Sequence, residues 1–225
     1  MKKDYYSGTL YGERLKRCYD IAPPRVKQYL DAEIEYIVKE IGGTDQVLEL
    51  GCGYGRVMKL VSPCVRTVVG VDTSGKTLAF AQEYLSRSLN CHIVQMDAAC
   101  LGFQSDIFDA VLCIQNGLSA FHVDSKLVVN EAIRVARPNG IILFSSYSPK
   151  FWKHRLEWFR LQSEEGLVGE IDESKTGEGL IICKDGFRAT LVREYQFRKL
   201  FTSERTEVSI VEVDESSVFA RVKVL

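Results

Sequence analysis

Short apolar segments alternate with amphipathic stretches along most of the chain. Five segments are mainly apolar, which is typical of buried parallel strands: 47–50, 67–72, 91–95, 108–114 and 141–144. Between them, apolar residues recur at helical spacing, as at positions 26, 30, 34, 37 and 41. Strands that alternate with helices in this way predict an α/β fold with a doubly wound, mostly parallel sheet.

The chain differs on both sides of this alternating region. The first residues combine tyrosines with basic residues and carry one short helical pattern, so we expect an N-terminal helical arm. From Pro149, large aromatic residues follow at helical spacing, and glycine-containing turns then separate short strand-like segments. A helix and two closing strands complete the predicted sheet. The sequence thus predicts one domain with an arm at 1–22, a core at 23–148, an inserted aromatic and β cap at 149–192, and a closing helix and strand pair at 193–225.

Composition excludes several classes of partner. The chain has 29 basic and 30 acidic residues and a formal net charge of −1, which argues against a broad surface for nucleic acid or anionic lipid. No apolar run approaches the roughly 18 residues that span a bilayer, and the start lacks the apolar core of a signal peptide. The seven cysteines and three scattered histidines show no metal-ligand spacing, and the cysteines are typical of reduced thiols. We therefore expect a cytoplasmic protein with no metal site and no nucleic-acid or membrane partner; no feature indicates an oligomeric state.

The first apolar segment runs directly into three glycines at alternate positions, Gly51, Gly53 and Gly55. Glycine accepts positive φ and lets a ligand lie on the main chain, while free N–H groups at the following helix start attract negative charge. An ordinary strand-to-helix turn is the alternative. A dinucleotide fingerprint, G-x-G-x-x-G, would require glycine where Arg56 stands, which disfavours a nicotinamide-dependent oxidoreductase.

Polar residues follow two further strands. Asp72 ends the second strand and lies about seventeen residues beyond Gly55, close to the spacing at which a carboxylate accepts from both ribose hydroxyls of a nucleotide. Alternatively, Asp72, Thr73 and Ser74 could cap the next helix. Gln115 and Asn116 follow the fourth strand, at the sheet edge where ligands of open α/β sheets bind.

Three motifs occur in the order found in one family. Residues 49–55, E-L-G-C-G-Y-G, resemble the E/D-x-G-x-G-x-G signature of class I S-adenosylmethionine-dependent methyltransferases. Residues 96–103 resemble that family's G-D-A-x-x-L-P-F segment, with Met96 and Gly102 in place of glycine and proline. Residues 136–140 resemble its L-K-P-G-G turn, in which Asn139 can take the left-handed conformation. The resemblance covers roughly residues 25–148.

This resemblance implies a seven-stranded sheet that ends in an antiparallel strand pair, S-adenosylmethionine as cofactor, and S-adenosylhomocysteine as product. It assigns the glycine turn to the methionine part of the cofactor, Asp72 to the ribose, and Asp97 with Ala98 to the adenine. A plain turn aspartate is the alternative for Asp97. The predicted cofactor-binding residues are Glu49, Gly51, Cys52, Gly53, Tyr54, Gly55, Asp72, Thr73, Asp97, Ala98, Gln115 and Asn116.

The methyl acceptor is harder to predict. The methyl group of a sulfonium is already activated, so the protein needs mainly to position the acceptor atom, and this leaves no clear motif. The near-neutral charge and the aromatic cap predict a small-molecule acceptor. Tyr11, Tyr147 and Trp152 are the candidate residues for binding this acceptor. His122, His154 or a tyrosine could act as a base, but none has a motif, so the catalytic residue is not predicted. The family's N-P-P-Y signature of amine methylation is absent after Asn116. A protein or RNA substrate, or a non-catalytic cofactor-binding module or partner subunit, are the alternatives.

Overall fold

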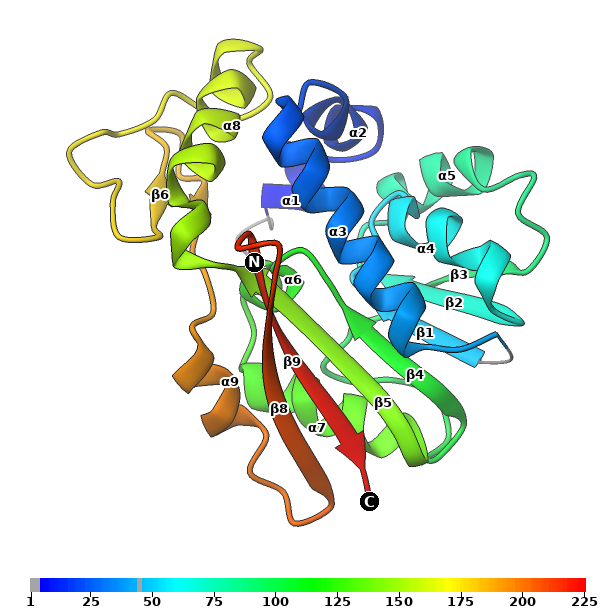
Figure 1. Cartoon of the computed structure of the whole chain (residues 1–225). Helices are drawn as coiled ribbons and strands as arrows, with labels where there is room; N and C mark the ends of the chain where they lie inside the picture. Colours follow the sequence, from blue (N-terminus) through cyan, green and yellow to red (C-terminus); the bar gives the residue numbers. More distant parts are fainter. Residues whose placement is uncertain (1–4, 44–45) are drawn as a thin grey trace.

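The computed structural model of the chain describes residues 5–43 and 46–225 and contains a seven-stranded sheet of order β3-β2-β1-β4-β5-β9-β8 (Figure 1). Neighbouring strands from β3 to β5 run parallel, and β9 is antiparallel to both β5 and β8. The predicted doubly wound sheet with an antiparallel last pair is thereby confirmed. The strands are β1 Gln46–Leu50, β2 Thr67–Asp72, β3 Cys91–Gln95, β4 Phe108–Cys113, β5 Ala136–Tyr147, β8 Thr206–Val213 and β9 Ser217–Val224.

Helices cover both faces of the sheet (Figure 1). Leu48 and Leu50 of β1 belong to the core beneath α7 and α9, whereas Val47 belongs to the core beneath α3, α4 and α5. This division follows from the two-residue repeat of a strand, and it also places Glu49 on the α3–α4 face. The helices named here are α3 Pro24–Glu40, α4 Arg56–Val61, α5 Gly75–Tyr84, α7 Ser125–Val135 and α9 Glu194–Leu200, with η1 Ser62–Cys64 after α4 and α6 Gly117–Ala120 after β4.

The buried face of α3 differs from the predicted one at one position. Val26, Leu30 and Ile37 are buried as expected, but Ile34 is only half-buried. Glu33 takes its place and is fully buried. The buried stripe therefore follows positions 26, 30, 33 and 37, because tertiary packing at the strand ends, rather than apolar character, selects which side of the helix faces inward.

The fifth strand begins earlier than predicted, at Ala136 rather than at residue 141. We expected the helix to end at the turn formed by residues 137–140 and the strand to begin at 141. Instead α7 ends at Val135, Ala136 already pairs with Phe108, and Ile141 pairs with Ala110, so residues 137–140 form a bulge within β5. Asn139 has φ 67°, as its predicted left-handed conformation requires.

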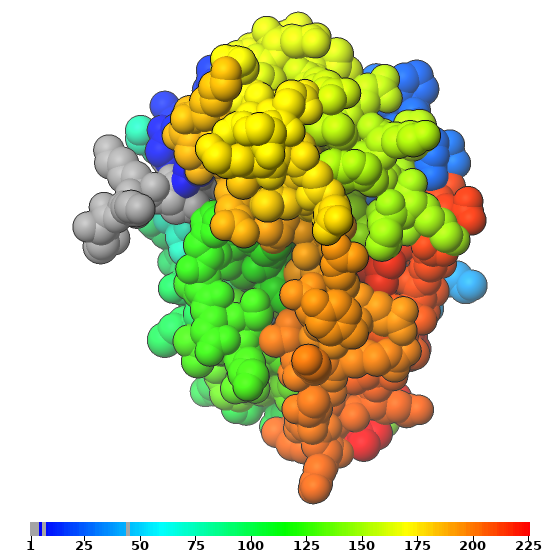
Figure 2. Space-filling model, turned by 90° about the vertical axis from the view of Figure 1, so that its left-hand side faces the viewer, coloured from blue at the N-terminus to red at the C-terminus, as the bar shows by residue number. Residues whose placement is uncertain are grey.

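The N-terminal arm and the cap pack on each other beyond the carboxyl ends of the parallel strands (Figure 1). Leu10 and Cys18 share one hydrophobic cluster with Phe159 of the cap, and Trp158 donates its indole N–H to the carbonyl of Cys18 at 2.8 Å. Figure 2 shows the yellow cap above and the orange segment that leads down to α9. The elements are α1 Tyr5–Gly8, α2 Glu13–Asp20, η2 Pro149–Phe151, α8 Trp152–Glu164, β6 Ile181–Ile182 and β7 Arg188–Ala189.

The first four residues of the predicted arm lie outside the described part of the chain, and the division into arm, core, cap and closing segment stays a prediction. The expected hairpins of the cap are short: they comprise the antiparallel pair β6–β7 and two isolated antiparallel bridges, Ile171–Cys183 and Gly177–Leu180. Within residues 5–43 and 46–225, no helix is both long and apolar enough to cross a membrane.

Candidate functional site

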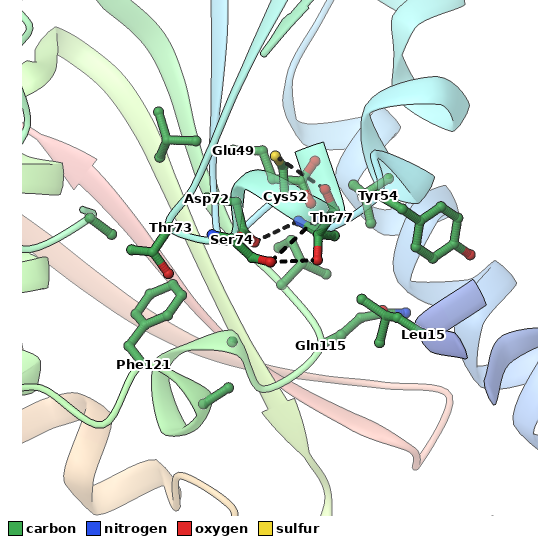
Figure 3. Close-up of a pocket in the computed structure, with 18 of the residues that line it drawn as sticks. Leu15, Glu49, Cys52, Tyr54, Asp72, Thr73, Ser74, Thr77, Gln115 and Phe121 are labelled. Carbon is green, nitrogen blue, oxygen red and sulfur yellow. Dashed lines mark hydrogen bonds between the residues drawn. The ribbon is translucent and has the colours of Figure 1, made fainter. Parts of the chain in front are cut away.

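A cavity opens at the carboxyl ends of β1, β2, β3 and β4, where the strand order reverses (Figure 3). It measures about 230 Å³, far more than one ordered water needs, so it is a ligand-sized space. Ten of the predicted cofactor residues line it: Glu49, Gly51, Cys52, Gly53, Tyr54, Asp72, Thr73, Asp97, Ala98 and Gln115. Gly55 and Asn116 are not among its lining residues.

All three glycines of the turn adopt positive φ. The values are 70° at Gly51, 53° at Gly53 and 85° at Gly55. A side chain at Gly51 would also collide with Phe121, and one at Gly55 with Leu85. The turn geometry therefore requires each glycine, and Gly51 and Gly53 additionally present main chain to the cavity.

Asp72 connects the glycine turn to the start of α5. One carboxylate oxygen accepts from the N–H of Gly53 at 3.0 Å, and the other accepts from the N–H of Ser74 at 2.8 Å. Ser74 in turn caps α5 by accepting from the N–H of Thr77. Ser74 therefore provides the helix cap that was the alternative role for this segment. The carboxylate of Asp72 is half-buried and lines the cavity.

The loop after β3 carries the two positions that depart from the family pattern. Met96 and Gly102 contact each other, because the Gly102 N–H donates to the Met96 sulfur at 3.3 Å. Asp97 accepts from the N–H of Ala99 at 2.8 Å, as a turn aspartate does, and it also lines the cavity. The two residues that depart from the family pattern therefore hold the loop closed by their mutual contact. Asp97 both stabilises the turn and lines the cavity.

An arginine of α7 fixes the same loop from below. Arg134 donates to the carbonyls of Leu101 and Phe103 at 2.9 and 2.8 Å. Glu131 accepts from the Leu101 N–H at 2.6 Å and pairs with Arg134. Neither residue was singled out from the sequence, because both look like an ordinary charged pair on a helix surface.

Arg56 also lines the cavity. In the sequence it counted only against a dinucleotide-binding fingerprint, which requires glycine at this position. Its Nε and Nη2 are buried and make no hydrogen bond to any described residue, and its guanidinium lies 5.1 Å from the ring centre of Tyr19. Glu49 beside it is buried, with Oε2 equally unpaired in the described part of the chain. Burial raises the pKa of Glu49 to about 8, against the lowering influence of Arg56.

A second buried carboxylate, Glu33, lies next to this group. Glu33 and Tyr29 are four residues apart on one face of α3, and both are fully buried. Burial raises the pKa of Glu33 to about 7, while Ser145, Arg56, Tyr29 and Gln115 face the carboxylate and limit the rise. Nevertheless, neither oxygen makes a hydrogen bond of normal geometry among the described residues. In the sequence, Glu33 could have been recognised as a charged residue at helical spacing from the buried positions 26, 30 and 37.

The predicted acceptor residues surround the cavity at a distance, and none of them lines it. Tyr147 is buried, with its ring centre 5.4 Å from that of Tyr29 and 4.4 Å from the Arg155 guanidinium. Trp152 packs against the cluster shared by arm and cap, and Tyr11 lies beneath the Lys76 ammonium group. Their role in acceptor binding stays a prediction.

Other residues of the arm do reach the cavity. Leu10, Leu15 and Tyr19 line it, and Figure 3 shows Leu15 at the cavity. Leu15 also lies against Gly53. The arm therefore packs on the cap and lines the cavity at the same time.

Asn116 has a structural task that the sequence did not predict. Its amide nitrogen donates to the carbonyl of Thr190 at 2.7 Å and to Ser119, and its amide oxygen accepts from the Ser146 hydroxyl at 2.7 Å. These bonds join the end of β4, the end of β5 and the chain before α9. The two candidate histidines also lie off the cavity lining: His154 faces Glu157 on α8, and His122 is exposed.

Glu33 makes a testable contribution to stability. Its folded-state pKa of about 7 exceeds the ordinary 4.5, so the folded protein keeps this proton to higher pH than the unfolded chain does. Stability is therefore lost as pH rises from 4.5 through 7. We expect the free energy of unfolding of Glu33→Gln, relative to the natural protein, to rise by roughly 2 kcal/mol between pH 5 and pH 8. Urea unfolding at both pH values measures it.

The matched control is Glu35→Gln, which removes an exposed carboxylate from the same helix. This variant should follow the natural protein at both pH values. A Glu33→Gln difference that is the same at pH 5 and pH 8 would contradict the raised pKa.

Comparison with known sequences identifies the domain. A family described as "Methyltransferase domain" matches residues 47–140. A ubiquinone biosynthesis O-methyltransferase from Pseudomonas fluorescens is 30% identical over 134 residues, or 58% of this chain and 53% of that protein. The uncharacterized protein MJ1252 from Methanocaldococcus jannaschii is 29% identical over 143 residues, or 64% of this chain and 50% of that protein. The chain therefore spans about half the length of the curated relatives it matches.

Comparison with solved structures agrees over the whole chain. The PH0226 protein from Pyrococcus horikoshii superposes with a TM-score of 0.67 at 21% identity and full coverage of both chains. The N-methyltransferase NodS from Bradyrhizobium japonicum, in complex with S-adenosylhomocysteine, superposes with a TM-score of 0.60 at 14% identity, covering 96% of this chain and 98% of that one. These identities establish a shared fold. The match of residues 47–140 to a methyltransferase domain agrees with the motifs, and together they support a class I S-adenosylmethionine-dependent methyltransferase.

Proposed function

We propose that this chain binds S-adenosylmethionine in the cavity and transfers its methyl group to a small-molecule acceptor. One observation carries the proposal: Arg56 and Glu49 line the cavity with buried polar atoms that have no partner among the described residues. The amino acid end of the cofactor brings a carboxylate and an ammonium group, which match a guanidinium and a carboxylate. Asp72, at the other side of the glycine turn, offers the acceptor oxygens that a ribose needs.

The residues of the chain then act by placement. When bound, S-adenosylmethionine supplies a methyl group already activated on a sulfonium. Glu49 and Arg56 would hold its amino acid end, and Asp72 would hold the ribose. Leu10, Leu15 and Tyr19 would exclude water above the glycine turn. Holding two reactants in line removes much of the entropic cost of their encounter, so these residues can accelerate transfer without forming a covalent bond.

A small-molecule acceptor is supported by the enclosure of the site and by the O-methyltransferase relatives. With methyl-tritiated cofactor and cell extract, we expect label in the small-molecule fraction. Label in protein or RNA would instead favour a macromolecular substrate. Cofactor binding without label in any fraction would favour a non-catalytic module. A cytoplasmic location belongs to the same proposal, with seven free cysteines as its support.

Substitution of Asp72 tests the ribose site. Asp72→Asn keeps the size of the side chain but removes the charge, and charge-assisted hydrogen bonds contribute about 1.5–3 kcal/mol, or roughly 10- to 100-fold in affinity. Calorimetric titration with S-adenosylhomocysteine should show this loss, and Asp31→Asn, an exposed change on α3, should not. Tight binding of NADH in parallel, without binding of S-adenosylhomocysteine, would overturn the assignment.

Substitution of Arg56 tests the amino acid end. Methylthioadenosine shares the nucleoside and sulfur of S-adenosylhomocysteine but lacks the amino acid carboxylate. Arg56→Gln should therefore weaken S-adenosylhomocysteine by about tenfold or more and leave methylthioadenosine unchanged. Lys59→Gln, an exposed cation one turn along α4, is the control. An equal loss for both ligands would show that Arg56 supports the turn rather than the carboxylate.

A further inference from the structure

The proposed function leaves one buried carboxylate without a task. Glu33 is fully buried on α3, and neither of its oxygens has a hydrogen-bond partner in the described part of the chain. The hydroxyl of Tyr29, one turn earlier, is buried and unpaired in the same sense. Ser145, Tyr29 and Gln115 face this carboxylate without a hydrogen bond of normal geometry, and buried carboxylates of this kind concentrate at functional sites. Packing alone gives no reason for a glutamate here.

Glu33 is not itself among the lining residues of the cavity, but it lies behind one of them, Gln115, at the end that the cofactor's nucleoside does not use. Gln115 lines the cavity after β4, faces Glu33, and has a buried amide nitrogen with no described partner. Ser145, on neighbouring β5, faces Glu33 as well. In the sheet order β3-β2-β1-β4-β5, the predicted ribose and adenine residues belong to the β2–β3 side. Glu33 therefore adjoins the opposite, β4–β5 side, where an acceptor would enter.

Buried aromatic and cationic groups pack around Glu33 behind the cavity wall. The rings of Tyr29 and Tyr147 lie 5.4 Å apart, and Arg155 lies 4.4 Å from the Tyr147 ring. The charged and titratable groups that face the Glu33 carboxylate are Arg56 from α4, Tyr29 from α3 and Tyr147 from β5.

We propose, resting on the proposed function, that the acceptor presents an N–H or O–H group at the Gln115 end of the cavity and that the Glu33 carboxylate behind Gln115 receives its proton. The lone pair of the acceptor nitrogen or oxygen forms the new bond to the methyl carbon. The carbon–sulfur bond breaks, and its electron pair stays on sulfur. The proton released from the acceptor passes to Glu33, so charge and atoms balance. The pKa of Glu33, about 7 through burial, suits a group that takes up and releases a proton near neutral pH.

Sinefungin is a probe that needs no identified acceptor. It carries an amine on the carbon that replaces the methylated sulfur, so its N–H groups project from the position of the transferred methyl. S-adenosylhomocysteine lacks this amine and shares the rest. At pH 8, Glu33→Gln should weaken sinefungin by about tenfold or more and change S-adenosylhomocysteine by less than about twofold. Calorimetric titration measures both, and Glu35→Gln should change neither.

Further variants separate this role from a structural one. Glu33→Asp keeps the charge and should retain part of the preference for sinefungin. If Glu33→Gln does not fold, the test uses the natural protein at two pH values. Its affinity for sinefungin relative to S-adenosylhomocysteine should fall from pH 8 to pH 5, because Glu33 gains a proton. Titration of Glu49 affects both ligands alike, because both carry the amino acid end.

The outcomes distinguish the two proposals. Failure of the natural protein to bind S-adenosylhomocysteine would overturn the proposed function. Binding with an unchanged sinefungin preference in Glu33→Gln, with equal losses for both ligands, or with a preference independent of pH would overturn the role of Glu33 alone.

Discussion

The site depends on the carboxylate of Asp72, which joins three parts of the chain at one strand end. Its two oxygens accept from the N–H groups of Gly53 and Ser74. The first bond holds the glycine turn in its left-handed conformation, and the second fixes the residue that caps α5. Because the strands are parallel, the turn, the cap and the loop after β3 meet at the same edge of the sheet. The cavity follows from that meeting.

Buried charge is the second constraint. Glu49, Arg56 and Glu33 lie on the α3–α4 face of the sheet, and polar atoms of each lack described partners. Uncompensated charges of this kind lower the stability of the folded chain. Burial holds the pKa of both carboxyls well above 4.5. A ligand that carries both an ammonium and a carboxylate would satisfy Glu49 and Arg56, so the proposed function offers a reason for part of this cost to stability.

The sequence predicted what local pattern determines. The strand ends, the three glycines and the position of Asp72 are read from neighbouring residues, and the doubly wound sheet with its antiparallel last pair is confirmed. The left-handed conformation of Asn139 was likewise predictable, since few other residues adopt it. The bulge around it was not, because a bulge is defined by the partner strand.

Tertiary contacts determine what the sequence did not predict. Glu33 belongs to the buried stripe of α3 only because the strand ends of β4 and β5 lie beneath it. The amide of Asn116 is occupied by Ser146 and by the distant Thr190, which no spacing rule connects. The roles of the predicted cofactor residues stay predictions, although ten of them line one cavity.

The most direct measurement of the central claim is a crystal structure of the chain with S-adenosylhomocysteine. The account predicts the ribose hydroxyls on Asp72, the nucleobase beside Asp97, and the amino acid end between Glu49 and Arg56. Ligand bound with its ends reversed, bound outside this cavity, or absent from it at saturating concentration would contradict the account.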